Sequence, residues 1–124
     1  MTQTIKVAPP NSFVLICDVQ GGIVPDPDAI AEAASISATN SCVTVCCLAE
    51  MDGETEIKLG PADEVWLNNR PAFEGTIETP THTVAVFTTE WTKLLEINVG
   101  SESSQLKIWT NRSREPDKIV IGVG

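Results

Sequence analysis

The feature that most constrains the fold of this chain is a series of short apolar runs, which prolines and glycines separate at regular intervals. Residues 13–17 form a continuous apolar run, which is typical of a well buried strand. In the segment 55–59, Ile57 and Leu59 alternate with Glu56 and Lys58, as one packed face and one wet face require. The other runs are also of strand length, and such spacing favours a β-sandwich or barrel. The predicted strands are 4–8, 11–20, 42–50, 55–59, 65–67, 75–78, 83–88, 93–99, 105–110 and 118–123.

The residue inventory supports strands as the main element. Valine, isoleucine and threonine together make up 36 of the 124 residues, and their branched Cβ atoms suit an extended backbone. A chain of this length fits one domain, and neither a repeat nor a linker divides it. We therefore expect residues 1–124 to form a single all-β domain, an antiparallel β-sandwich with at most one short helix.

Two local predictions concern the connections between strands. The alanine-rich run 29–34 has the propensity of a short helix that Asp28 would cap. The alternative is a loop followed by a strand, because residues 35–39 alternate polar and apolar side chains. The pair Asp52-Gly53 lies between two β-prone runs and is the strongest hairpin signal in the chain.

Charge and targeting signals limit the classes of function. Seventeen acidic residues against eight basic ones give a net charge of −9, which disfavours binding to nucleic acid. The first ten residues hold no apolar run of a secretory signal, and no stretch is long enough to span a membrane. We expect a cytoplasmic protein whose four cysteines stay as thiols.

The residues that usually carry catalysis or metals are sparse. Cys42 and Cys46 would lie roughly 13 Å apart on an unbent strand, too far to share one zinc ion. His82 is the only histidine and lies in a predicted turn. A nucleophile at Cys17 with His82 and Asp18 would lie inside an apolar strand, where desolvation makes a thiol inert. We assign no catalytic residue, no metal ligand and no cofactor.

Acidic side chains and two large C-terminal residues are the candidates for binding a partner. Asp52, Glu54 and Glu56 belong to an acid-rich first half of the chain, which can steer a basic protein such as a nuclease or toxin. Trp109 and Arg112 are residue types enriched in interface hot spots. Trp109 lies opposite Leu106 and Ile108 in the alternation, so it either covers a second face or meets a partner. The alternatives to an interaction module are a carboxylate-dependent hydrolase and a homo-oligomer, such as a dimer, that pairs exposed strand edges.

Two late runs and one earlier segment also suggest a family. The late runs are SQLKIWTN (104–111) and the closing strand KIVIGV (118–123), and a polar Ile-Ser segment precedes the long run CVTVCCLAE (42–50). In this order of strands the chain resembles the competence protein J family, small bacterial β-sandwich proteins that inhibit a DNA-entry nuclease. The resemblance implies a non-enzymatic, inhibitor or immunity-type protein. The cysteine-rich strand and the absence of tyrosine depart from it, and no inhibitory residue is transferred.

Overall fold

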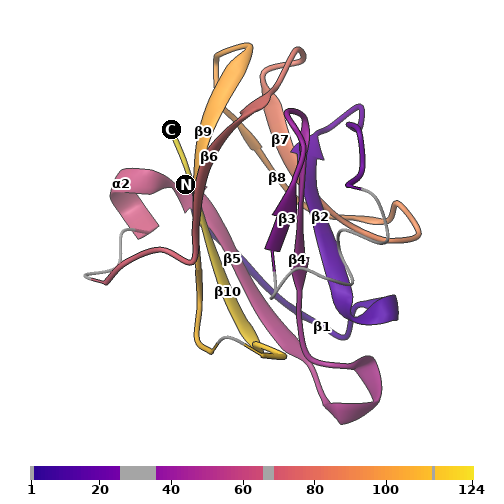
Figure 1. The fold of residues 1–124 in the computed structure, drawn as a ribbon. Helices are drawn as coiled ribbons and strands as arrows, with labels where there is room; N and C mark the ends of the chain where they lie inside the picture. Colours follow the sequence, from indigo (N-terminus) through magenta and orange to yellow (C-terminus); the bar gives the residue numbers. More distant parts are fainter. Residues whose placement is uncertain (1, 26–35, 66–68, 113) are drawn as a thin grey trace.

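The computed structural model describes residues 2–25, 36–65, 69–112 and 114–124, which form two five-stranded β-sheets packed as two layers (Figure 1). The first sheet has the strand order β1-β5-β10-β9-β6, and the second has the order β3-β4-β2-β7-β8. The predicted all-β sandwich is confirmed. The strands are β1 (Gln3–Val7), β2 (Phe13–Asp18), β3 (Ile36–Ala38), β4 (Cys42–Cys46), β5 (Thr55–Pro61), β6 (Phe73–Glu78), β7 (Thr83–Thr88), β8 (Lys93–Asn98), β9 (Ser103–Thr110) and β10 (Lys118–Val123).

The space between the two sheets holds an aliphatic core. Every second residue of the central strands points into it, as Ile57 and Leu59 do from the first sheet and Val14 and Ile16 from the second. These four side chains are fully buried, so the alternation seen in the sequence is the alternation of the pleat. The sandwich is mainly antiparallel, and β5 and β10 form its parallel pair.

Helical structure in the described ranges consists of one α-helix, α2 (Ala62–Val65), and two 3₁₀ turns, η1 (Pro10–Ser12) and η2 (Glu50–Asp52). None of these helices has the length or the apolar run that crossing a bilayer requires. The predicted helix 28–34 lies outside the described residues. The alternative strand over 35–39 is represented by β3.

The predicted hairpin at Asp52-Gly53 is wrong. Strand β4 belongs to the second sheet and β5 to the first, so the connection between them crosses from one layer to the other. Gly53 has φ 137° and ψ −170°, a conformation that suits glycine but does not close a tight two-residue turn. Strand β5 pairs instead with β1 and β10, and these long-range partners override the local turn signal.

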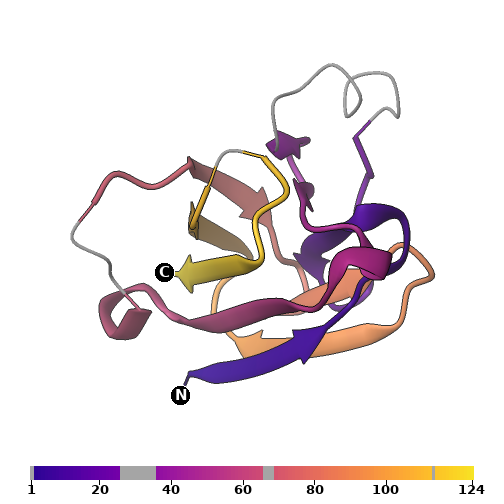
Figure 2. The same cartoon turned by 90° about the horizontal axis from the view of Figure 1, so that it is seen from below.

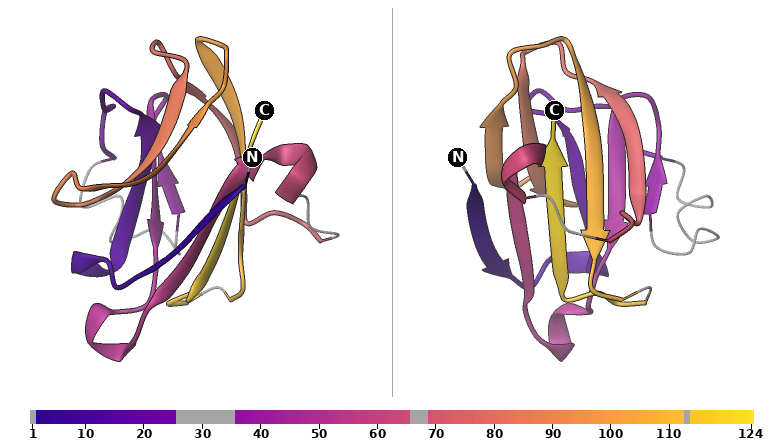
Figure 3. Two further views of the ribbon diagram at one scale, coloured as in Figure 1. Left: turned by 180° about the vertical axis from the view of Figure 1, so that it is seen from behind. Right: turned by 90° about the vertical axis from the view of Figure 1, so that its left-hand side faces the viewer.

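The predicted strand 65–67 is also wrong at Val65, which ends α2; its other two residues lie outside the described ranges. The reason is a pair of glycines, because Gly60 on β5 lies directly opposite Gly122 on β10. A methyl group added at either glycine would lie within about 3.1 Å of the Val65 side chain. The missing side chains therefore let α2 lie on the outer face of the first sheet, where Figure 3 shows it over β5 and β10.

The two sheets differ in their outer faces. On the first sheet, Glu56 and Lys58 point outward, and Lys6 and Lys118 lie beside Glu56 in the neighbouring strands. On the second sheet, five of the residues of β2, β4 and β7 that alternate with the core are apolar and buried too. We call this group the outer apolar cluster; it consists of Leu15, Cys17, Cys42, Ala85 and Phe87. A continuous apolar run such as 13–17 is therefore covered on both of its faces.

Candidate interaction surface

The connection from β4 to β5 carries the most exposed acidic side chains among the predicted binding residues. Glu50 and Asp52 lie in η2, Glu54 follows Gly53, and all three are exposed. Met51 stands between the first two and has 89% of its surface accessible to solvent. We call residues 50–54 the acidic loop. It combines three exposed acidic side chains with one exposed apolar side chain in a five-residue segment at an end of the sandwich.

Glu56 lies apart from Asp52 and Glu54 in its electrostatic surroundings. It is half-buried in β5, where Lys6 and Lys118 are its register partners on the two sides. Cross-strand neighbours of opposite charge attract each other, so these lysines offset the charge of Glu56. Of the three predicted acidic residues, Asp52 and Glu54 in the acidic loop therefore present more negative charge to a partner than Glu56 in β5 does.

Arg112 lies in the connection from β9 to β10, which runs beside the acidic loop. The Leu48 amide donates to the Pro116 carbonyl at 3.0 Å, and the Glu56 amide donates to the Asp117 carbonyl at 2.8 Å. Arg112 is exposed, and its Nε donates to the Glu115 carbonyl at 2.9 Å. The structure thus brings Arg112 to the same end as Asp52 and Glu54.

Trp109 is buried, with 2% of its surface accessible. Its indole lies on the outer face of β9 next to Gly122, and its Nε1 donates to the Asn69 carbonyl at 3.0 Å. Of the two alternatives in the sequence, burial favours the one in which Trp109 covers a second face of the sheet. Its indole has no open surface to offer a partner.

The acidic loop continues into two neighbouring elements. The 3₁₀ turn η1 contacts η2, and the side-chain amide of Asn11 in η1 donates to the Thr89 hydroxyl at 2.7 Å. Thr89 belongs to the turn between β7 and β8, which carries Trp91. Figure 2 shows η1, η2 and this turn gathered on one side of the molecule. One surface therefore joins the carboxylates of the acidic loop to an exposed tryptophan.

Met51 and Trp91 were missed in the sequence. Both stand alone in polar surroundings, in the segments EMDGE and TTEWTK, and such isolation is the signal that could have identified them. An apolar residue in the middle of a polar turn cannot serve the period-two pattern of a strand. It is left either to cover a neighbouring element or to face solvent.

The four cysteines are free thiols. Cys47 lies in the core, Cys17 and Cys42 lie in the outer apolar cluster, and Cys46 is half-buried at the end of β4. Cys17 and Cys42 are register partners, and the hydrogen bond between their side chains, together with burial, raises the pKa of Cys17. Burial also raises the pKa of Cys46 and brings that of Cys47 to about 11. At neutral pH these three thiols therefore stay protonated, which opposes a role as nucleophiles.

The raised thiol pKa values predict a loss of stability in alkali. Between about pH 9 and pH 11 the unfolded chain releases the Cys47 proton while the folded protein keeps it. The free energy of unfolding should therefore fall as pH rises through this window, by up to about 1.4 kcal/mol per pH unit for each such thiol. Urea unfolding from pH 8 to pH 11 measures this slope. A Cys47→Ala variant should show a shallower slope, and an equal slope in both proteins would contradict the assignment.

Asp18 and His82 make hydrogen bonds that hold the chain at the ends of strands. The buried Asp18 carboxylate accepts hydrogen bonds from the Thr81 amide and hydroxyl, at 3.0 and 2.7 Å, and from the Gln20 amide at 3.0 Å. His82 has a φ of 62° in the turn after β6, and its amide donates to the Thr79 carbonyl at 2.9 Å. In the part of the chain that the structure describes, no three His, Cys, Asp or Glu side chains come together as a metal site.

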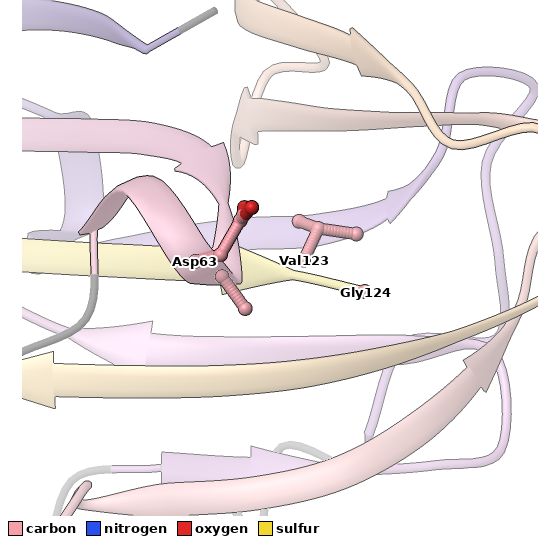
Figure 4. Close-up of a pocket in the computed structure, with 4 residues that line it drawn as sticks. Asp63, Val123 and Gly124 are labelled. Atoms are coloured by element: carbon pink, nitrogen blue, oxygen red, sulfur yellow. The ribbon is translucent and has the colours of Figure 1, made fainter.

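A hollow of about 610 Å³ lies at the opposite end of the first sheet, beside α2. Figure 4 shows Asp63 of α2 next to the end of β10 at Val123 and Gly124, which line this hollow with Ala62. Asp63 is the charged side chain among these four lining residues.

Comparisons with known proteins agree with this architecture. The chain matches no protein-family model and no curated protein sequence. Its fold is similar to the crystal structure of ComJ, the inhibitor of the DNA-degrading activity of NucA from Bacillus subtilis, with a TM-score of 0.69 and 10% sequence identity over 98% of this chain and 93% of ComJ. It is also similar to the product of crocagin biosynthetic gene J, with a TM-score of 0.57 and 10% identity over 99% of this chain and 97% of that one. The resemblance to competence protein J seen in the sequence is therefore confirmed as a likeness of fold.

Proposed function

We propose that this protein is a non-enzymatic interaction module that binds a basic protein partner through the acidic loop, and that the partner is a nuclease or a toxin that acts on nucleic acid. The observation that carries the proposal is the acidic loop itself, in which Glu50, Asp52 and Glu54 are all exposed and flank the exposed Met51 in the chain.

The chemistry of the acidic loop fits a protein that binds polyanions. A nuclease presents cationic groups where it binds the phosphates of its substrate. Exposed carboxylates can occupy such positions, and an apolar side chain among them supplies a contact that excludes water. Met51 fits this role because an unbranched thioether adapts its shape to a partner surface.

The charge of the whole chain favours rapid association with a basic partner. A net charge of −9 attracts a cationic protein over a distance of about 8 Å at physiological ionic strength. The acidic loop carries three exposed carboxylates within five residues, whereas Glu56 has lysines as its register partners on both sides. A local excess of negative charge orients a basic protein as it approaches.

The likeness of fold supports the choice of a nuclease. ComJ is an inhibitor of the DNA-degrading activity of NucA, and its fold covers nearly all of this chain. A β-sandwich of this kind can thus serve as the inhibitor of a nuclease.

The test removes charge from the acidic loop without changing its shape. The double variant Asp52→Asn, Glu54→Gln should bind a nuclease of the same organism with an association rate about tenfold lower at low salt, because electrostatic steering is lost. The measurement combines stopped-flow binding with an assay of DNA degradation in the presence of the protein. Inhibition should weaken in the same variant.

The matched control removes two exposed carboxylates from β6. Glu74→Gln, Glu78→Gln changes the net charge equally but leaves the acidic loop intact. It should reduce the association rate much less than the first variant. Equal rates for the two double variants would reject the acidic loop as the contact. Full DNA degradation by every nuclease of the organism at saturating protein would reject the nuclease as the partner.

A further inference from the structure

A second hollow lies on the outer side of the second sheet, close to the surface that carries the acidic loop. Its volume is about 390 Å³, and we call it the Trp91 pocket. Figure 1 shows the two segments that border it, the chain after β2 and the turn between β7 and β8, on the side away from the first sheet. The lining residues are Val19, Gln20, Gly21, Gly22, Phe87 and Trp91.

One wall of the Trp91 pocket is glycine backbone. The Gly21 amide donates to the Asp18 carbonyl at 2.7 Å, which turns the chain back over the outer apolar cluster. A methyl group at Gly22 would lie 2.3 Å from the Ser41 carbonyl oxygen and 3.3 Å from the Cys17 side chain. Only glycine, which has no side chain, lets the backbone lie this close to Ser41 and Cys17. The glycine wall is therefore held at a short distance from the second sheet.

The other wall is an indole. Trp91 has 46% of its surface accessible, and its ring packs edge-on against Phe87 with 5.2 Å between ring centroids and 64° between ring planes. One edge of the indole lies 4.0 Å from the position of a methyl group at Gly21. The two walls therefore face each other across Phe87.

The backbone holds Trp91 in a costly conformation. Its φ of 62° lies in the left-handed region, which large side chains rarely adopt. Hydrogen bonds of Thr88 fix the turn, since its carbonyl accepts from the Trp91 amide at 2.9 Å and its hydroxyl accepts from the Thr92 amide at 3.2 Å. Strain of this kind persists where neighbouring contacts determine the geometry, and it places the indole as a rigid surface.

The net charge of −9 and an exposed acidic residue next to Trp91 in the chain favour a cationic occupant of the Trp91 pocket. The lining residues that the structure describes are uncharged, and Glu90, which directly precedes Trp91, is exposed. An arginine guanidinium is flat, stacks on an indole and is less strongly hydrated than an ammonium group. Its methylene stem can cover the Phe87 side of the pocket while its head meets the Glu90 carboxylate.

We propose that the Trp91 pocket binds an arginine side chain of the protein partner, with the guanidinium stacked on Trp91 and Glu90 as its counter-charge. This inference rests on the proposed function, because that function supplies a basic partner. It adds a second contact, separate from the acidic loop, in which one residue type is recognised by its shape.

The experiment uses short peptides as probes of the full chain. Acetyl-Gly-Arg-Gly-amide should change the tryptophan fluorescence in a saturable way and bind at least about threefold more tightly than the lysine and leucine versions, as expected for a stacked guanidinium. Trp91→Leu should abolish the response. Glu90→Gln should weaken binding, whereas Glu102→Gln, which removes an exposed acid from the β8–β9 turn, should leave it unchanged.

Other outcomes would overturn the proposal. These are an absence of saturable binding, equal binding by Trp91→Leu with its fold intact by circular dichroism, and tighter binding of the lysine or leucine peptide. The Asp52→Asn, Glu54→Gln variant separates this proposal from the proposed function. It should bind the arginine peptide normally, so unchanged nuclease inhibition together with retained peptide binding would reject the acidic loop and leave the Trp91 pocket standing.

Discussion

Replacing Trp109 by alanine should lower the free energy of unfolding by about 3–5 kcal/mol, the usual cost of removing a fully buried large aromatic side chain. Trp109 is 2% exposed and fills the outer face of the first sheet between α2 and β9. Its removal leaves a cavity beside Gly122, where no other side chain can move in from the strand. It also leaves the Asn69 carbonyl without the indole donor.

Two other tryptophan variants make this result specific. Trp109→Phe keeps most of the ring but loses the hydrogen bond to Asn69, so it should cost less than the alanine variant. Trp91→Ala removes a half-exposed tryptophan and should cost least of the three. Urea unfolding measures all of them. A loss below about 1 kcal/mol in Trp109→Ala would mean that the indole is not part of the packed structure.

Replacing Asp18 by alanine should destabilise the protein by about 3 kcal/mol, because buried donors to a carboxylate are left without an acceptor. The Asp18 carboxylate joins the end of β2 to the turn before β7 through the amide and hydroxyl of Thr81. It also accepts from the Gln20 amide at the start of the segment that forms the Trp91 pocket. Asp18 is 1% exposed, so water cannot take its place without rearrangement.

The control for Asp18→Ala is a substitution of Thr81, the residue that donates two hydrogen bonds to the Asp18 carboxylate. Thr81→Val removes the hydroxyl donor and keeps the backbone one, so it should cost roughly a third to a half of the effect of Asp18→Ala. Urea unfolding again gives both values. Equal stability of Asp18→Ala and the unmodified protein would show that the carboxylate contributes nothing to the junction of β2 and β7.

The strands of this fold could be predicted because their signal is local. Ile57 and Leu59 alternate with charged residues, and the same alternation places them in the core. Sheet membership could not be predicted in this way. The Asp52-Gly53 pair has the chemistry of a hairpin turn, but β5 finds its partners in β1 and β10, which are distant in the sequence.

The helix α2 and the exposure of Trp91 could not be predicted for the same reason, because both depend on residues that are distant in the sequence. Val65 has a high strand propensity, yet it ends a helix because Gly60 and Gly122 meet in register and leave room for it. The exposed acids of the loop could be predicted from charge alone. Trp91 could not, because its exposure depends on a glycine segment and a strained turn that the alternation of apolar residues does not reveal.

The most direct test of the central claim, that this protein acts by binding a basic partner through its acidic loop, is the salt dependence of association with the organism's nuclease. The association rate should fall at least about tenfold between 20 mM and 500 mM salt, as screening shortens the reach of the −9 charge. The Asp52→Asn, Glu54→Gln variant should show a shallower dependence. A rate that is independent of salt and equal in both proteins would contradict the claim.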